Sequence, residues 1–349
     1  MQALEGRRSG AIPFMPAVYE QKAWFIGKTP SEVCRDEDLL VDAVIAEEEA
    51  LRPDGVIVGI DVYNVEAEAV GCAVSYPGGG ATGIPALTPG GEALPDDAPV
   101  SGLFMPDPEK DGRMPMMIRA TERIGAITGG RIPVMAAATA PFSLAASIAG
   151  PSNLFMAMAS DPERAGEIIE FSTRVVERYC GAFARRGIMV ALFDSHASPG
   201  LIAPRRYREF AMAPARRVIA GLRRAGLSHV PLIIGGNTDA ILDDYAATGG
   251  SFLLCDGPSS TSRFLEVCGG LGRSFRKNIP SDLIARGPVE EIRARAAEEL
   301  AVAGRYAGFI LGTGIIPYGT PTENVLAVGE ARDMGAFGGD SAGSTGTRH

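Results

Sequence analysis

Short apolar runs alternate with longer helical patterns along most of this 349-residue chain. Each run is apolar almost throughout, which is typical of a strand whose two faces are both covered. Strands of this kind that are separated by helices predict a parallel sheet. The runs are Gly55–Asp61, Ile132–Thr139, Ile188–Asp194, Pro231–Gly235, Ser251–Asp256, Arg273–Lys277 and Gly308–Gly312.

Seven such strands predict an α/β fold, a (β/α)8 TIM barrel in which the pattern misses one strand. A doubly wound open sheet is the alternative. The Gly/Pro-rich stretch Tyr76–Pro108 has no periodicity, and we expect it to lie over the barrel mouth. We expect a single domain over residues 1–337 and a flexible, Gly/Ser-rich tail over residues 338–349.

Helical patterns with recognisable starts fill the intervals between several of these strands. Asp161 followed by Pro162, for example, places a capping side chain before a proline at the first helical position. The predicted helices run from Asp36–Asp38 to about Leu51, from Asp161 to about Arg186, and over Pro204–Arg224, Thr238–Ala247, Pro288–Ala303 and Pro321–Met334.

Charge and cysteine usage exclude several classes of protein. The net charge of −9 argues against a protein that tracks nucleic-acid phosphates. The five cysteines form no CxxC pair, which argues against a disulfide framework, a zinc finger or an iron–sulfur motif. No apolar run is long enough to span a membrane, and the first residues lack the apolar stretch of a signal peptide. We therefore expect a cytoplasmic protein that acts on small molecules.

Polar residues follow several of the predicted strands, where a barrel carries its functional groups. A carboxylate at the end of an apolar strand is costly unless it is paired or solvated in a cleft. Each acid alone can also be a helix cap. Together they predict one cleft at the barrel mouth. The residues are Asp61, Asp194, Ser195, His196, Asn237, Asp256 and Lys277.

His196 is the one histidine on this predicted rim, and Asp194 lies two residues before it. The pair can form an oriented acid and base, while a histidine bonded to a nearby carbonyl is the structural alternative. Glu66 follows the first strand and is expected to point inward. Gly235–Thr238 offers backbone N–H groups for an anion or forms only a tight turn, and Cys255 is expected to pack in the barrel wall.

Five segments resemble the uroporphyrinogen decarboxylase superfamily, including its cobalamin-linked methyltransferase branch. The resemblance covers most of the chain in order, and it implies a (β/α)8 barrel with its site at the C-terminal mouth. The segments are residues 54–72, 150–169, 193–214, 235–256 and 319–337.

The residues that decide activity in each branch are only partly present. Zinc-dependent methyltransferases of the family carry a His-x-Cys-Gly-Asn-Thr segment and a later cysteine, where this chain has Ile233, Gly235 and Thr313. These side chains cannot replace three zinc ligands. Zinc would need another set of ligands, and the candidates are Glu66, Asp194, His196 and Cys255.

The decarboxylase branch matches at Asp61 and at Ser195, but its arginine-rich N-terminal element is absent. The corresponding region carries Lys22 and Lys28, and Thr313 again replaces a late family histidine. A tetrapyrrole with eight carboxylates needs a cationic cleft. The sequence therefore argues against uroporphyrinogen itself as the substrate.

The resemblance and the rim residues together predict a methyltransferase. It would move a methyl group between a small methoxy, methylthio or methylamine compound and a corrinoid carried by a partner protein. A metal-free decarboxylase or lyase, or a non-catalytic corrinoid- or porphyrin-binding barrel, is the alternative. We expect a monomer or homodimer. The predicted catalytic residues are Asp61, Asp194 and His196, and the predicted substrate-binding residues are Glu66, Ser195, Asn237, Asp256 and Lys277.

Overall fold

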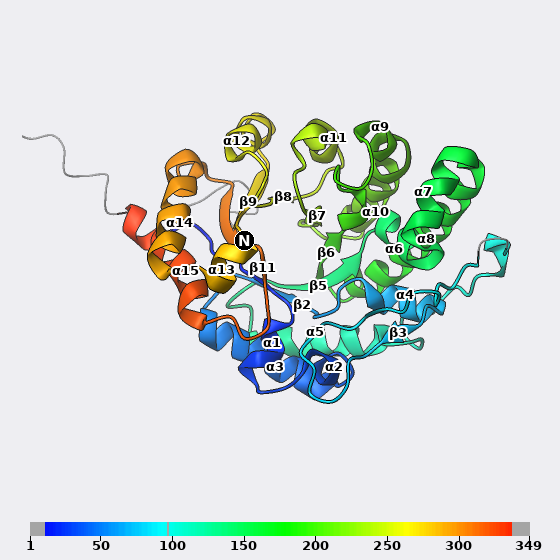
Figure 1. Cartoon of the computed structure of the whole chain (residues 1–349), viewed down its shortest axis with the longest axis horizontal. Coiled ribbons are helices and arrows are strands. Elements are labelled where there is room, and N and C mark those ends of the chain that lie inside the picture. The colour runs from blue at the N-terminus through cyan, green and yellow to red at the C-terminus, as the bar shows by residue number, and fades with distance from the viewer. Residues whose placement is uncertain (1–10, 96–97, 337–349) are drawn as a thin grey trace, which may run out of the picture.

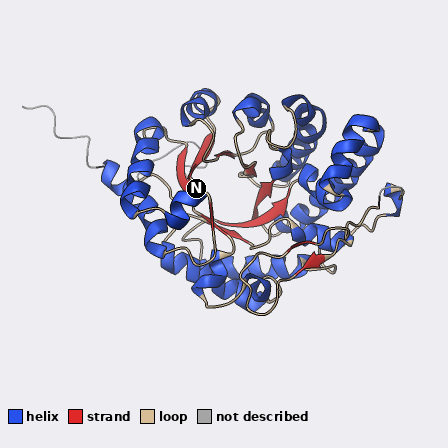
Figure 2. Cartoon of the chain, in the orientation of Figure 1, coloured by secondary structure: helices blue, strands red, loops and turns tan. Residues whose placement is uncertain are grey.

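The computed structural model describes residues 11–95 and 98–336, so the predicted tail lies outside the described residues. One curled sheet of seven parallel strands has the order β10-β9-β8-β7-β6-β5-β2, and helices surround it (Figures 1 and 2). All seven predicted strands are present. They are β2 Val56–Val58, β5 Val134–Thr139, β6 Met189–Phe193, β7 Leu232–Ile233, β8 Phe252–Cys255, β9 Ser274–Ile279 and β10 Phe309–Thr313.

The N-terminal segment lies between the two edge strands of the curled sheet. Met15 donates its N–H to the carbonyl of Leu311 on β10 (2.8 Å), and Asp54, just before β2, donates to the carbonyl of Phe14 (2.8 Å). Strand β1 (Ala17–Val18) then pairs in parallel with β11 (Ile315–Ile316). Both edges of the sheet are thus bonded to one segment, which argues against the open-sheet alternative.

The predicted helices are present, with their ends displaced by a few residues. Side-chain oxygens of Asp36 and Asp161 cap two of them by accepting backbone N–H groups, and Ser260 caps a further helix, Thr261–Gly270, in the same way. The longer helices are α3 Glu37–Leu51, α5 Met114–Thr128, α8 Pro162–Ala184, α10 Met212–Arg224, α12 Thr261–Gly270, α14 Val289–Ala303 and α15 Thr322–Ala336. The shorter ones are α1 Gln21–Phe25, α2 Pro30–Val33, α4 Asn64–Val70, α6 Pro141–Ala149, α7 Pro151–Ser160, α9 Pro204–Arg206, α11 Leu242–Ala247 and α13 Ser281–Arg286.

Two predicted helices differ from the regular α-helices expected. The stretch Pro204–Arg224 contains one turn of π-helix at Tyr207–Ala211, and the helix predicted from Thr238 begins with a 3₁₀ turn at Asp239–Ile241. No single described helix is long and apolar enough to cross a membrane; α6 and α7 pass such a test only as a pair, and they are bent by 103°.

The buried apolar residues form two clusters, one on each face of the sheet. The larger cluster lies between the strands and the surrounding helices. The smaller one lies inside the curl and includes Tyr19, Phe193, Ile233, Leu254 and Ile310. Several of its members also line a cavity at the carboxyl ends of the strands. The inner cluster therefore forms the floor on which a ligand would rest.

The Gly/Pro-rich stretch after α4 lies beside this cavity, in agreement with the prediction that it covers the mouth. It is not wholly irregular, because β3 (Val74–Ser75) pairs in antiparallel with β4 (Ala86–Leu87). The N–H of Leu94 also donates to the carbonyl of Ile148 on α6 (3.0 Å). Residues 84–89, 91 and 92 contribute to the cavity wall.

Candidate active site

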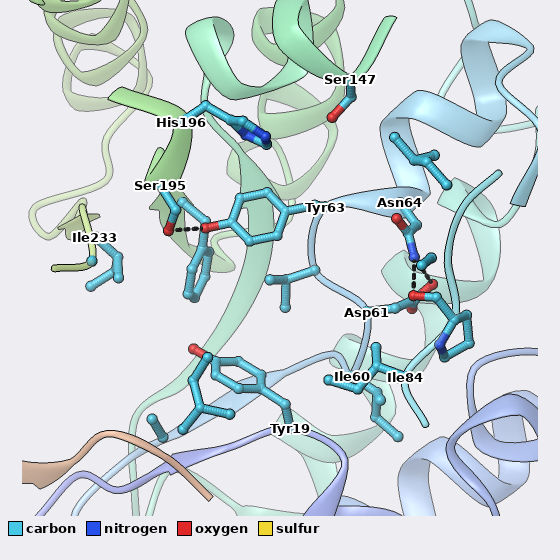
Figure 3. Close-up of a pocket in the computed structure, with 18 of the residues that line it drawn as sticks. Tyr19, Ile60, Asp61, Tyr63, Asn64, Ile84, Ser147, Ser195, His196 and Ile233 are labelled. Atoms are coloured by element: carbon cyan, nitrogen blue, oxygen red, sulfur yellow. Dashed lines mark hydrogen bonds between the residues drawn. The ribbon is translucent and has the colours of Figure 1, made fainter. Parts of the chain in front are cut away.

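A cavity of about 1130 Å³ opens at the carboxyl ends of the parallel strands. Its lining combines the inner apolar cluster with polar side chains from the loops after β2, β6, β8 and β9. Figure 3 shows Tyr63, Ser195 and His196 on one side and Asp61 and Asn64 on the other. The polar or ionisable lining residues include Tyr19, Asp61, Tyr63, Asn64, Glu92, Ser195, His196, Asp256, Arg276 and Asn278.

His196 and Ser195 reach the cavity, as the sequence analysis predicted. The Ser195 Oγ and the Tyr63 hydroxyl are hydrogen-bonded at 2.5 Å, and burial raises the pKa of Tyr63 to about 12. The His196 ring contacts the Tyr63 ring edge-on, with centroids 6.3 Å apart. Burial lowers the pKa of His196, so the imidazole is neutral at pH 7. Its Nδ1 is buried without a hydrogen-bond partner among the described residues.

Asp194 does not line the cavity and is not bonded to His196 in the manner expected of an acid–base pair. Its Oδ1 accepts hydrogen bonds from the N–H (2.9 Å) and the hydroxyl (2.8 Å) of Ser143. The Ser143 hydroxyl oxygen also accepts the N–H of His196 (3.1 Å). Burial raises the pKa of Asp194 to about 7. Asp194 therefore supports the β6 loop from behind and contacts His196 only through Ser143.

Asp61 lines the cavity, but its carboxylate is already occupied. Arg113, at the start of α5, donates to both of its oxygens (2.9 and 2.7 Å), and the Asn64 amide donates to Oδ2 (3.1 Å). The Arg113 guanidinium also contacts Glu68 (2.5 Å). A carboxylate held in a bidentate pair is poorly placed to stabilise a cation on a substrate. Arg113 lies 52 residues from Asp61, and nothing local in the sequence announces the pair.

Glu66 points into the protein between α4 and β5 and does not line the cavity, contrary to its predicted substrate role. Its carboxylate accepts the N–H (2.7 Å) and the hydroxyl (2.9 Å) of Thr139. The side chain is fully buried, and burial raises its pKa to about 7. Glu66 joins the end of β5 to α4.

Lys277 lies on the outer face of β9 and does not reach the cavity, so its predicted role in substrate binding is corrected. Its ammonium donates to the carbonyls of Asp256, Gly257 and Ser259 (3.2, 3.1 and 2.8 Å). Side chains alternate between the faces of a strand. The neighbouring residues Arg276 and Asn278 therefore face the cavity instead.

Asp256 lines the cavity as predicted, whereas Asn237 does not. The Asp256 carboxylate accepts the Asn278 amide (3.0 Å) and the Gly236 N–H (2.9 Å). Asn237 is exposed and holds its own turn by accepting the N–H of Asp239 (3.0 Å). With the Gly236 N–H donated to Asp256, Gly235–Thr238 forms a tight turn and not the anion seat that was the other interpretation.

The residues present do not fit a zinc ion. The described part of the chain contains no group of three or more His, Cys, Asp or Glu side chains placed to hold a metal. The alternative set is not brought together, because Glu66 and Asp194 are buried behind the cavity wall. Cys255 is buried as well, which raises the pKa of its thiol to about 12. Thr313, at one family ligand position, accepts the N–H of Ala17 (3.1 Å).

A family model for uroporphyrinogen decarboxylase (URO-D) matches residues 1–334. The chain belongs to the uroporphyrinogen decarboxylase family. The family resemblance that the sequence segments suggested is thus confirmed, and the known members are enzymes, decarboxylases and methyltransferases.

Relatives of both kinds match this family member at similar identity. The methylated-thiol–coenzyme M methyltransferase of Methanosarcina mazei is 26% identical, covering 84% of this chain and 76% of the relative. The methylcobamide:CoM methyltransferase MtaA of Methanosarcina barkeri is 25% identical, covering 77% and 76%. A uroporphyrinogen decarboxylase of Neisseria meningitidis is 25% identical, covering 87% and 85%.

Solved structures agree on the architecture. A methyltransferase from Methanosarcina mazei superposes with a TM-score of 0.85 at 25% identity, covering 95% of this chain and 96% of that one. A B12-independent methionine synthase from Shewanella has a TM-score of 0.62 at 9% identity, covering 93% and 98%, and this likeness concerns the fold alone.

Proposed function

We propose that this family member transfers a methyl group between a small methoxy, methylthio or methylamine compound and a corrinoid presented by a partner protein. The methyltransferase relatives support this proposal, and one observation within the site carries it. His196 presents a neutral imidazole at the cavity, with no carboxylate bonded to it. Such a group can accept a proton from a substrate heteroatom.

Methyl transfer to a thiol, phenol or ammonium requires the proton on the sulfur, oxygen or nitrogen to leave. The bound corrinoid would supply or take up the methyl group. His196 accepts the heteroatom's proton as the new bond to carbon forms, and it returns a proton to the leaving heteroatom in the reverse direction. Since the described residues offer no zinc site to acidify a thiol, the imidazole of His196 takes this proton.

The remainder of the cavity supports a ligand larger than the methyl donor alone. Its volume exceeds that of most pockets for a single small molecule. Phe193, Ile233 and Leu254 form an apolar floor that would exclude water from the reacting atoms. In this proposal the N-terminal segment at Phe14–Val18 serves as the eighth strand of the barrel. The protein is a monomer or homodimer, and the corrinoid-carrying partner docks at the open mouth of the barrel.

The test uses the purified protein, methylcobalamin and a panel of thiols, phenols and amines under anaerobic conditions. We expect loss of the methylcobalamin absorption band and formation of a methylated acceptor, identified by mass spectrometry. Failure with every acceptor class, in both directions of transfer, would refute the proposal.

A metal-free decarboxylase or lyase is the second candidate, and the decarboxylase relatives at 25% identity favour it. The pairing of Asp61 with Arg113 disfavours it, since the carboxylate that would stabilise an iminium is already neutralised. Release of CO₂ from a carboxylated substrate without any methyl product would establish this alternative. A shift of a corrin or porphyrin absorption band without turnover would instead indicate a binding protein.

A further inference from the structure

A buried arginine lies on the inner face of β9. Arg276 is paired in the sheet with Leu254 on β8 and Ile310 on β10, both members of the inner apolar cluster. Its side chain is 1% exposed and lines the cavity. Arg276 is one of the largest fully buried side chains, and the others are tyrosines, phenylalanines and lysines. An arginine in this place is unusual because burial of a guanidinium is expensive.

The described residues do not satisfy every donor of the Arg276 guanidinium. Its Nε and Nη1 are buried, and neither has a hydrogen-bond partner in the described ranges of the chain. The carboxylate of Asp256 acts on it electrostatically, but both Asp256 oxygens already accept hydrogen bonds from Gly236 and Asn278. Buried charges in proteins are normally paired. The described residues therefore leave these two nitrogen atoms without the partner that a buried charge normally has.

The backbone of β10 leaves room for this arginine. A Cβ on Gly312 would lie 2.9 Å from the Arg276 Cδ and 2.6 Å from the carbonyl oxygen of Met15. No side chain at position 312 fits without displacing one of them. The stem of Arg276 thus passes over a glycine, where any side chain would crowd it.

We propose that Arg276 binds the carboxylate of a small organic substrate whose remaining atoms occupy the cavity. A planar guanidinium matches a planar carboxylate through two parallel hydrogen bonds. A single charge suits the site, because Lys277 points away and Asp256 already contributes a negative charge nearby. The inference names the substrate class for the proposed methyltransferase and rests on that function only in treating the anion as substrate.

A second unpartnered atom further restricts the class of substrate that fits the cavity. The Asn278 Oδ1 is buried without a hydrogen-bond partner among the described residues and lies on the same face of β9, two residues from Arg276. It can accept one hydrogen bond from a hydroxyl, amine or thiol group. A short carboxylate with such a donor a few bonds away satisfies both residues.

Binding is measured apart from turnover by titration calorimetry, with butanoate and its neutral amide, butanamide, as probes. We expect the wild type to bind butanoate at least tenfold more tightly than the variant Arg276→Met, with butanamide binding equal in both. Arg276→Gln, whose amide can bond to neighbouring groups, is the second variant should the first fold poorly. Arg305→Gln removes an exposed positive charge and is the charge-matched control, expected to bind butanoate like the wild type.

Equal binding of butanoate and butanamide by the wild type would overturn the inference, as would unchanged butanoate binding in a folded Arg276 variant. The corresponding turnover test compares 3-mercaptopropionate with 3-mercaptopropionamide as methyl acceptors. We expect kcat/KM for the acid to fall in Arg276→Met while that for the amide stays unchanged. Butanoate binding together with failure of methyl transfer to every acceptor class, in both directions, would preserve this inference and refute the proposed function.

Discussion

The polar groups on two walls of the cavity differ in whether they have hydrogen-bond partners within the described chain. On the wall formed by the loop after β2, Asp61 and Asn64 are bonded to each other, and Asp61 also pairs with Arg113, which in turn contacts Glu68 behind the wall. On the wall formed by β6 and β9, His196 and Arg276 line the cavity, and both have buried nitrogen atoms without a partner in the described chain. Satisfied networks hold a structure together, whereas unsatisfied buried atoms are available to a ligand. We therefore expect the first wall to stabilise the fold and the second wall to bind the ligand.

The sharpest test of the second wall is His196→Ala. We expect kcat for methyl transfer to fall by about 10²- to 10⁴-fold, the usual contribution of general acid–base catalysis. The thermal midpoint should stay within a few degrees of the wild type, because the imidazole Nδ1 makes no hydrogen bond with the described protein. Steady-state kinetics and a thermal melt check both outcomes. A large fall in the midpoint with little loss of kcat would make His196 a structural residue.

The first wall is tested by Arg113→Met. Removing this guanidinium leaves the buried carboxylate of Asp61 without its partner, and we expect a loss of about 3–5 kcal/mol in the free energy of unfolding. Arg119→Met on the same helix breaks an exposed pair with Glu37 and should cost less than about 1 kcal/mol. Urea unfolding of both variants compares them directly. Equal effects would show that Arg113 is not the centre of a structural network.

Glu66 lies behind the cavity wall and has a structural role. The pH dependence of the free energy of unfolding tests this role. The folded pKa of Glu66, about 7, lies above the ordinary 4.5, so its favourable contribution is complete below about pH 4.5 and is lost as the pH rises through 7. Glu66→Gln should therefore be more stable than the wild type by about 3 kcal/mol at pH 8 and by less than about 1 kcal/mol at pH 5.

The matched control for this prediction is Glu47→Gln. Burial also raises the pKa of Glu47 to about 7, but Glu47 pairs with the buried ammonium of Lys22 at 3.2 Å. Its replacement leaves a buried cation unpaired and should destabilise the protein. Urea unfolding at pH 5 and pH 8 measures both variants. Loss of methyl transfer in Glu66→Gln, with the fold intact, would return Glu66 to the active site.

The smallest effect is expected for Asn237→Ala. This residue is exposed, and its side chain bonds only to the N–H of Asp239 and the carbonyl of Pro258, so the change should alter stability by less than about 1 kcal/mol and kcat/KM by less than about twofold. A tenfold fall in kcat/KM, measured with the same acceptor as for His196→Ala, would restore its predicted role in substrate binding.

The strands could be predicted because a strand covered on both faces is apolar along its whole length. The bridging segment around Phe14 could not, since its strand β1 has only two residues and its partners lie near Asp54 and on β10. Nothing in the local pattern marks such a segment. Its bonds depend on how far the sheet curls, which only the folded structure determines.

The positions of the site residues along the chain could be predicted, but the direction in which each side chain points could not. Strand ends correctly marked Ser195, His196 and Asp256 as cavity residues. They did not distinguish Lys277 from Arg276, because that choice depends on which face of β9 points inward. The register of β9 with its neighbours decides it. Charge pairs formed by distant residues, such as Asp61 with Arg113, leave no local pattern either.

The segment that joins the two edges of the sheet also has a consequence for the order of assembly. Ala17 and its hydrogen-bond partner Thr313 are separated by 296 residues. The first strand can therefore form its hydrogen bonds only after the last strands of the chain have been synthesised. Contacts between such distant positions form late because a long loop must close first. On the ribosome, the floor of the cavity can be completed only after β10 has emerged. Until then Tyr19 and the other N-terminal members of the inner apolar cluster lack the neighbours that bury them in the folded protein.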